Sequence, residues 1–228
     1  MVNMSPFKGF EGVLSSRDGE NVKLYTINLV PGVEPFPVET AYTPLGEARQ
    51  WDPHHSKLAA ALLTGLKEFP LRRDSRVLYL GAASGRTVTH VSDLVTDGVV
   101  MAVEFSPRAL RELVQNCGMR HNVFPVLGDA TKPQEYRWFV TRPFDVIYQD
   151  VAQPNQAEIL VNNARWYLKK GGTCMLAIKA RSVDSTADPN AIIRDQLQYL
   201  EGQGMVLRER LWLEPYSKDH AFVTCGFE

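Results

Sequence analysis

Between residues 76 and 203, short apolar segments alternate with segments of helical period, and this alternation restricts the possible fold more than any other feature of the chain. We interpret the apolar segments as strands and the segments between them as helices. The predicted strands are 76–81, 99–105, 122–129, 144–150 and 172–179, and the predicted helices are 84–95, 107–117, 155–170 and 188–203. Because strands joined by helical crossovers run parallel, the pattern predicts an α/β fold with a doubly wound sheet and helices on both faces.

The C-terminal part of the chain modifies this sheet. Two further strands are predicted at 205–213 and 220–228, and only residues 214–219 separate them. That connection is too short for a parallel crossover, so the pair should be antiparallel. The prediction is therefore a seven-stranded, mostly parallel sheet with an antiparallel strand near the C-terminus.

The N-terminal part has no long helical pattern and reads as a small β subdomain, residues 1–50. An Asp18-Gly19 turn signal precedes a strand-like segment, and the proline-rich stretch 31–39 predicts a bend or linker. Asp52 and Pro53 are typical of a helix start, with Asp52 as N-cap of a helix that continues through residues 54–69. We expect residues 51–228 to form the α/β domain.

Charge and hydropathy exclude several classes of protein. The 228 residues carry a formal net charge of −1, whereas proteins that bind nucleic acid alone usually have a basic excess. No apolar run approaches the roughly 20 residues of a membrane helix, so we expect no membrane association. The first ten residues lack a signal-peptide pattern, so we expect a cytoplasmic protein.

Cysteines and histidines point to neither disulfides nor a metal. The three cysteines are far apart in sequence, and none forms a C-x-x-C pair, so we expect reduced, buried thiols. His54 and His55 are neighbours on a predicted helix and point in different directions, while His90 and His121 have no ligand partners in sequence. We predict no metal site.

The ends of the first three predicted strands indicate a nucleoside-type cofactor site, because ligands of such sheets bind beyond the carboxyl ends of the strands. Gly81 and Gly85 bracket a tight turn where a Cβ would obstruct a close ligand, although such a turn also occurs in any α/β protein. Neither a phosphate loop nor G-x-G-x-x-G is present. Glu104 could accept hydrogen bonds from both ribose hydroxyls, Phe105 could lie against adenine, and Asp129 could take the adenine amino group. S-adenosylmethionine fits this pattern best.

The remaining strand ends carry a set of residues suited to proton transfer. Asp150 ends the fourth strand, Lys179 ends the fifth, Lys57 lies in the early helix, and His220 begins the last strand. We expect all four at one edge, where a lysine could accept the proton of a ribose 2′-hydroxyl during methyl transfer and Asp150 could orient it. Singly, Lys57 could be a surface lysine, Lys179 a lysine that extends to solvent, and His220 a structural histidine. The proton acceptor could be Lys179, Asp150 or water.

Several motifs resemble the fibrillarin family in its archaeal form, over nearly the whole chain. They are AYTPLGEARQWDPHHSKLAAALL (41–63), VLYLGAASGRTVTHVSDLV (77–95), GDATKP (128–133), YQDVAQPNQ (148–156), AIKARS (177–182) and PYSKDHAFV (215–223). The resemblance implies an S-adenosylmethionine-dependent RNA 2′-O-methyltransferase acting on ribosomal and transfer RNA. It also implies assembly with a box C/D guide RNA, a Nop-type scaffold protein and a kink-turn-binding protein. Guide RNA pairing would select the site, which agrees with the small net charge.

The same resemblance assigns residues. Lys57, Asp150 and Lys179 take three places of a Lys-Asp-Lys-Glu set, and His220 stands in the place of the glutamate, with Asp219 as its rival. The glycine turn departs from G-x-G-x-G, with Ala83 in the middle place, and Arg86 and Val88 flank Thr87 where family members often have threonine and proline. The implied cofactor residues are Gly81, Ala82, Ala83, Arg86, Thr87, Glu104, Phe105, Asp129, Ala130, Asp150 and Gln153.

Three other functions stay open or disfavoured. A stand-alone methyltransferase of a small hydroxylated molecule would act without RNA or partners. A non-catalytic subunit of an RNA particle is opposed by the intact Lys57, Asp150 and Lys179, and a nicotinamide oxidoreductase by the missing G-x-G-x-x-G. Candidate surfaces for the scaffold protein are the exposed apolar residues of 155–170 and 188–203.

Overall fold

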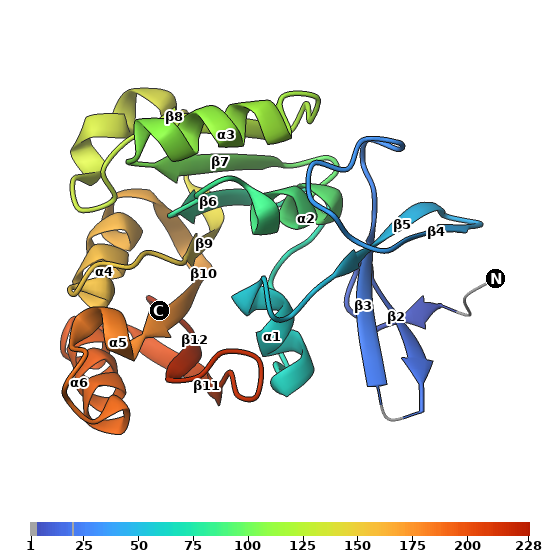
Figure 1. The fold of residues 1–228 in the computed structure, drawn as a ribbon. Coiled ribbons are helices and arrows are strands. Elements are labelled where there is room, and N and C mark those ends of the chain that lie inside the picture. The colour runs from blue at the N-terminus through green and yellow to red at the C-terminus, as the bar shows by residue number, and fades with distance from the viewer. Residues whose placement is uncertain (1–3, 20) are drawn as a thin grey trace.

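The computed structural model describes residues 4–19 and 21–228, which form two sheets with helices around the larger one (Figure 1). The larger sheet has seven strands in the order β11-β12-β10-β9-β6-β7-β8. In chain order they are β6 (Arg76–Leu80), β7 (Val99–Glu104), β8 (Val123–Leu127), β9 (Phe144–Gln149), β10 (Leu168–Lys179), β11 (Val206–Trp212) and β12 (His220–Gly226). Strands β8, β7, β6, β9 and β10 pair in parallel, and β12 is antiparallel to both of its neighbours. The predicted doubly wound fold with one reversed strand is confirmed.

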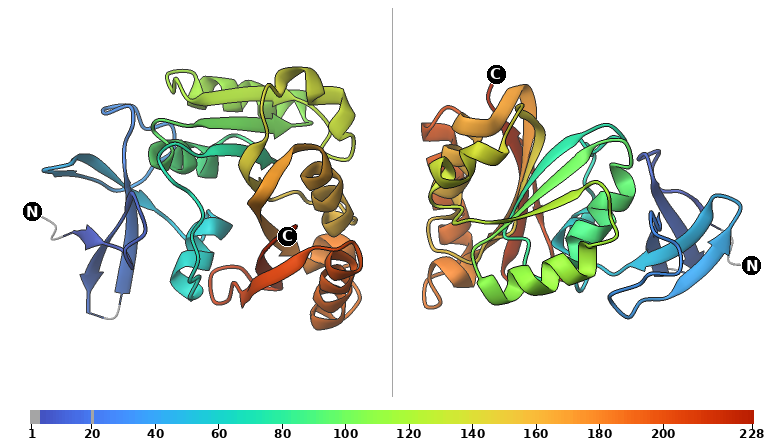
Figure 2. Two further views of the ribbon diagram at one scale, coloured as in Figure 1. Left: turned by 180° about the vertical axis from the view of Figure 1, so that it is seen from behind. Right: turned by 90° about the horizontal axis from the view of Figure 1, so that it is seen from above.

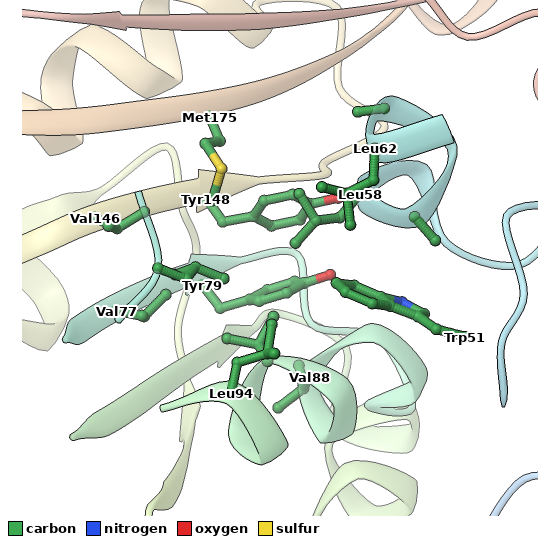
Figure 3. Close-up of a cluster of buried hydrophobic side chains, with 14 of the residues drawn as sticks. Trp51, Leu58, Leu62, Val77, Tyr79, Val88, Leu94, Val146, Tyr148 and Met175 are labelled. Carbon is green, nitrogen blue, oxygen red and sulfur yellow. The ribbon is translucent and has the colours of Figure 1, made fainter. Parts of the chain in front are cut away.

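The larger sheet is buried on both faces, because consecutive strand residues enter two different hydrophobic clusters. Val77 and Tyr79 of β6 point into one cluster, while Leu78 and Leu80 point into the other. Figure 3 shows the first cluster, where Tyr79 and Tyr148 lie beside Leu58 and Trp51. The helices are α1 (Lys57–Thr64), α2 (Arg86–Leu94), α3 (Pro107–Cys117), the 3-10 helix η1 (Pro133–Phe139), α4 (Gln156–Tyr167), α5 (Ala180–Val183) and α6 (Pro189–Gly202). Two-sided burial explains why the strands have continuous apolar sequences. None of the described helices is long and apolar enough to cross a bilayer.

The N-terminal residues form a separate antiparallel sheet on one side of the molecule (Figure 2). Its strands are β1 (Ser5–Pro6), β2 (Val13–Asp18), β3 (Asn21–Ile27), β4 (Thr40–Thr43) and β5 (Gly46–Trp51), in the order β1-β2-β3-β5-β4. Asp18 pairs with Asn21, as the Asp18-Gly19 turn signal predicts. The hairpin of β4 and β5 was not predicted, since its residues lack a clear alternation of apolar and polar side chains.

A buried polar cluster joins this sheet to α2. Asp93 of α2 lies between Arg49 of β5 and Arg120, with Arg49 Nε 2.8 Å from Asp93 Oδ2 and Arg120 Nη1 2.6 Å from Asp93 Oδ1. The proline-rich stretch 31–39 also belongs to this joint, because Glu34 forms an ion pair with Arg49 at 2.8 Å. Residues 31–39 are therefore a fixed bend and not a free linker.

The first helix begins later than the sequence predicts. Asp52 does not cap it: Ser56 is the N-cap and its Oγ accepts from Ala59 N, while Asp52 accepts from His54 N. The reason is that Trp51 belongs to β5, so residues 52–56 form the turn between strand and helix, with Trp51 Nε1 donating to Ser56 Oγ at 3.0 Å. Helix α4 ends at Tyr167, earlier than predicted, because β10 begins at Leu168.

Candidate active site

The carboxyl ends of β6, β7, β8, β9 and β10 surround a cavity of about 340 Å³. Its volume is within the usual range for small-ligand sites, about 300–1,000 Å³. The lining residues are Gly81, Ala83, Val103, Glu104, Phe105, Ala109, Gly128, Ala130, Asp150, Val151, Ala152, Gln153 and Lys179. Most of the wall is apolar. Its charged residues are Glu104 at the end of β7, Asp150 directly after β9 and Lys179 at the end of β10.

Glu104 is a buried carboxylate held by the backbone. Its Oε2 accepts from Ala83 N at 2.8 Å and its Oε1 accepts from Ser106 N at 2.9 Å. A carboxylate can accept about four hydrogen bonds, so each oxygen retains capacity toward a ligand. The hydrogen bond from Ala83 N–H to Glu104 connects the turn after β6 to the end of β7. In this turn Ala83 adopts a left-handed backbone conformation, with φ 48°.

The glycine turn is required by the protein itself. A Cβ on Gly85 would lie 2.7 Å from Leu113 Cδ1, and a Cβ on Gly81 would lie 3.0 Å from the carbonyl oxygen of Asp150. The expectation that both glycines keep space for a ligand is wrong for Gly85, which allows α3 to pack against the turn. Gly81 does line the cavity and brings the backbone of Asp150 close to the turn.

Seven of the predicted cofactor residues line the cavity: Gly81, Ala83, Glu104, Phe105, Ala130, Asp150 and Gln153. The other four lie outside its lining. Ala82 is buried, Arg86 stacks its guanidinium 4.6 Å from the Phe36 ring, Thr87 donates to Ser56 Oγ at 3.1 Å, and Asp129 accepts from Thr131 N at 2.9 Å. The assignment of these four residues to the cofactor stays a prediction, and their side chains make the local contacts given above.

Five lining residues were not predicted as site residues: Val103, Ala109, Gly128, Val151 and Ala152. Val151 and Ala152 follow Asp150 directly in the quoted motif, so their position after the strand was the available signal. Val103 lies within β7, and Ala109 lies in the first turn of α3, where its small size is the only hint.

The four predicted catalytic residues meet at the rim of the cavity. Lys179 Nζ lies 2.7 Å from Asp150 Oδ1 and donates to the carbonyl oxygen of Asp150 at 2.9 Å. Lys57 Nζ lies 3.4 Å from Asp150 Oδ2. Lys179 pairs with His220 across β10 and β12, as the predicted antiparallel strand requires. The convergence of these residues on one edge agrees with the sequence prediction; their roles stay a proposal.

His220 is half-buried, and its surroundings favour the neutral imidazole. Burial lowers its pKa, the nearby Lys57 and Lys179 lower it further, and Asp150 and the carbonyl oxygen of Lys218 act in the opposite direction. His220 Nδ1 lies 2.6 Å from the carbonyl oxygen of Lys218. Since a carbonyl only accepts, Nδ1 carries the proton and Nε2 is left as an acceptor.

Asp219, the rival of His220, is engaged elsewhere. Its Oδ2 lies 3.0 Å from Arg181 Nε, and its carbonyl oxygen accepts from Ala180 N. The side chain therefore neutralises Arg181, while His220 faces the two lysines. Within residues 4–19 and 21–228, no group of three or more His, Cys, Asp or Glu is placed to hold a metal ion.

A seven-stranded sheet with a reversed strand, a buried carboxylate at the end of β7 and a cation-rich rim define an S-adenosylmethionine-dependent methyltransferase. The fibrillarin family model matches residues 4–228. A fibrillarin-like rRNA/tRNA 2′-O-methyltransferase of Methanocaldococcus jannaschii is 48% identical over 212 residues, which are 92% of each chain. The chain belongs to the fibrillarin family.

Solved structures agree with this assignment. A Methanococcus jannaschii fibrillarin, described as a pre-rRNA processing protein, superposes with a TM-score of 0.94 at 44% identity, over 100% of this chain and 98% of the other. Aeropyrum pernix fibrillarin with natively bound S-adenosyl-L-methionine gives 0.88 at 39% identity, over 99% and 100%. A fibrillarin/Nop5p complex gives 0.83 at 40% identity, over 90% and 94%.

Proposed function

We propose that this chain transfers a methyl group from S-adenosylmethionine to ribose 2′-hydroxyls of ribosomal and transfer RNA. The observation that carries the proposal is Asp150, placed between Lys57 and Lys179 at the rim of the cavity. The names of the fibrillarin-like relatives supply the RNA substrates.

The cavity suits the cofactor by the chemistry of its lining. The buried Glu104 carboxylate can accept from two ribose hydroxyls, and Phe105, Ala109 and Ala130 offer an apolar wall to adenine. Gln153 and the Asp150 carboxylate lie in the same lining and suit the polar, positively charged end of the cofactor. When bound, the cofactor supplies a methyl group activated by a sulfonium.

The rim residues can manage the proton that the reaction releases. A ribose hydroxyl is a very weak acid, so it must lose its proton as it attacks. Unprotonated Lys179 can take that proton, and Asp150 stabilises the resulting ammonium through the 2.7 Å contact. Lys57 is a second cation on the same carboxylate. General base assistance of this kind is typically worth about 10²–10⁴-fold in rate.

The proposed assembly consists of this chain, a Nop-type scaffold protein, a box C/D guide RNA and a kink-turn-binding protein. The fibrillarin/Nop5p complex of a relative supports the scaffold partner. A net charge of −1 supports a division of labour in which partners and guide RNA provide most of the RNA affinity.

The test is transfer of tritiated methyl groups from S-adenosylmethionine to a target RNA, with and without guide RNA and the two partner proteins. We expect transfer only in the full assembly, and a loss of about 10²–10⁴-fold in Asp150→Ala and Lys179→Ala. Lys169→Ala is the matched control, because Lys169 lies near the opposite end of the same strand and pairs with Asp145 on the same neighbouring strand. Near-normal transfer by both rim variants would remove the mechanism, and transfer by the chain alone would favour a stand-alone methyltransferase.

A further inference from the structure

Gln156, the first residue of α4, places its side-chain amide against the backbone of Lys179. Its Oε1 accepts from Lys179 N at 2.9 Å, and its Nε2 donates to the Lys179 carbonyl oxygen at 3.2 Å. The side chain is completely buried. One primary amide therefore satisfies both backbone groups of the residue that carries the rim ammonium.

The side-chain amide of Gln156 lies beside β10 at a point that the neighbouring strand β9 does not reach. Strand β9 pairs with β10 up to Gln149 and Leu176, and then leaves the sheet. On its other side, β10 stays paired with β12 through Lys179 and His220. Without Gln156, the last backbone groups of β10 that face β9 would be buried without a partner, which is costly. The glutamine amide continues the ladder beyond the end of β9.

A second glutamine holds Gln156 in this place. Gln149, also completely buried, donates from Nε2 to the carbonyl oxygen of Gln156 at 2.7 Å. This bond closes the loop 150–155 at its base, and that loop contains Asp150, Val151, Ala152 and Gln153 of the cavity lining. The position of Lys179 and the position of Asp150 are thus set by the same pair of buried amides.

We infer that Gln156 is a positioning residue, which fixes the backbone of Lys179 so that its ammonium meets Asp150 at the cavity rim. The inference rests on the proposed function, in which Lys179 takes the proton. Glutamine is required because the site needs a donor and an acceptor side by side. A methionine of similar length offers neither, and a glutamate offers a second acceptor to the Lys179 carbonyl oxygen.

The experiment compares Gln156→Met, Lys179→Ala and wild type within the complete assembly. Single-turnover rate, the Kd for S-adenosylmethionine and hydrogen exchange at the Lys179 amide are measured for each. A displacement of about 1 Å can cost up to roughly 10²-fold in rate, so we expect Gln156→Met to lose about 10–10²-fold. The Kd for S-adenosylmethionine should be unchanged, and the Lys179 amide should exchange faster.

The control is Gln196→Met. Gln196 Oε1 accepts from Ala157 N at 2.8 Å, so it supports the same helix start without touching Lys179. We expect this variant to keep the wild-type rate, which separates positioning of the lysine from support of α4. If Gln156→Met does not fold, Gln156→Glu preserves size and the acceptor for Lys179 N, and should also lose rate.

The possible failures are distinguishable. A wild-type rate in Gln156→Met or Gln156→Glu, with Lys179→Ala inactive, overturns the positioning role and leaves the proposed base intact. A wild-type rate in Lys179→Ala overturns the proposed base. In that case exchange at the Lys179 amide decides the positioning role: unchanged protection in Gln156→Met overturns it, and faster exchange supports it.

Discussion

Two aspartates of this protein each lie between two cations, and they differ in almost every other respect. Asp93 contacts Arg49 and Arg120, whose side chains are 0% and 3% exposed, and it also accepts from Thr26 Oγ1 and Leu29 N. Asp150 contacts Lys57 and Lys179, whose side chains are 24% and 16% exposed. Arginine cannot give up its proton under physiological conditions, whereas lysine can. The first cluster is therefore fixed in charge and joins the two sheets, while the second contains lysines, which suit the proton transfer proposed above.

The sharpest test of this difference is Lys179→Arg. The substitution keeps the positive charge beside Asp150 but removes a group that can take a proton at neutral pH. We expect single-turnover methyl transfer to fall by about 10²–10⁴-fold, with little change in thermal stability. If Lys179→Arg retains most of the activity, Lys179 acts through its charge alone. The two clusters would then not differ in proton transfer.

The converse experiment removes Asp93. Because Asp93→Ala leaves the buried Arg120 guanidinium without a carboxylate and leaves Arg49 with Glu34 alone, we expect a loss of about 3–5 kcal/mol in the free energy of unfolding, measured in urea. The matched control is Asp97→Ala, since Asp97 pairs with Arg73 on the surface and such pairs contribute at most about 1 kcal/mol. A loss in Asp93→Ala no larger than in Asp97→Ala would show that the buried cluster does not stabilise the joint.

The two clusters also differ in how far the sequence predicts them. Asp150, Lys179 and His220 were predicted to meet because each lies at the end or start of a strand, and the order of strands brings those ends to one edge. Arg49 and Asp93 give no such signal. A charged residue within a strand or helix is usually solvated, and only the packing of the N-terminal sheet on α2 buries these two.

The same limit explains the smaller discrepancies. Asp52 has the residue type of an N-cap, yet Trp51 ends a strand that the sequence pattern does not reveal, so the helix starts after Ser56. Arg86 follows the glycine turn, and its guanidinium stacks on Phe36 of the distant stretch 31–39, a contact that the sequence pattern does not reveal. Local pattern predicts the α/β units and their strand ends, whereas contacts between the two sheets depend on tertiary packing.

A histidine lies beside each aspartate cluster: His90 beside Asp93 and His220 beside Asp150. The third prediction concerns His90. His90 stacks on Trp51 at 5.2 Å between ring centroids, and its Nδ1 lies 2.9 Å from Thr26 Oγ1. The Thr26 hydroxyl donates its proton to Asp93, so it accepts from His90 Nδ1–H, and His90 is a neutral ring within the cluster. Burial lowers the pKa of His90 well below its usual value, and Arg49 and Arg120 lower it further.

The sign of the effect follows from this direction. Below about pH 6.5 the unfolded chain binds a proton at His90 that the folded protein excludes. The free energy of unfolding should therefore be independent of His90 above about pH 6.5. At lower pH it should decrease, by at most about 1.4 kcal/mol per pH unit.

Urea unfolding between pH 7.5 and pH 5 measures this slope. His90→Phe should reduce the slope, whatever its effect on absolute stability, and substitution of the exposed His121 by glutamine should leave it unchanged. His220 is only half-buried, so it should contribute less to the slope. Equal slopes in His90→Phe and wild type would mean that the Asp93 cluster admits a proton, and the proposed contrast with the active-site cluster would no longer hold.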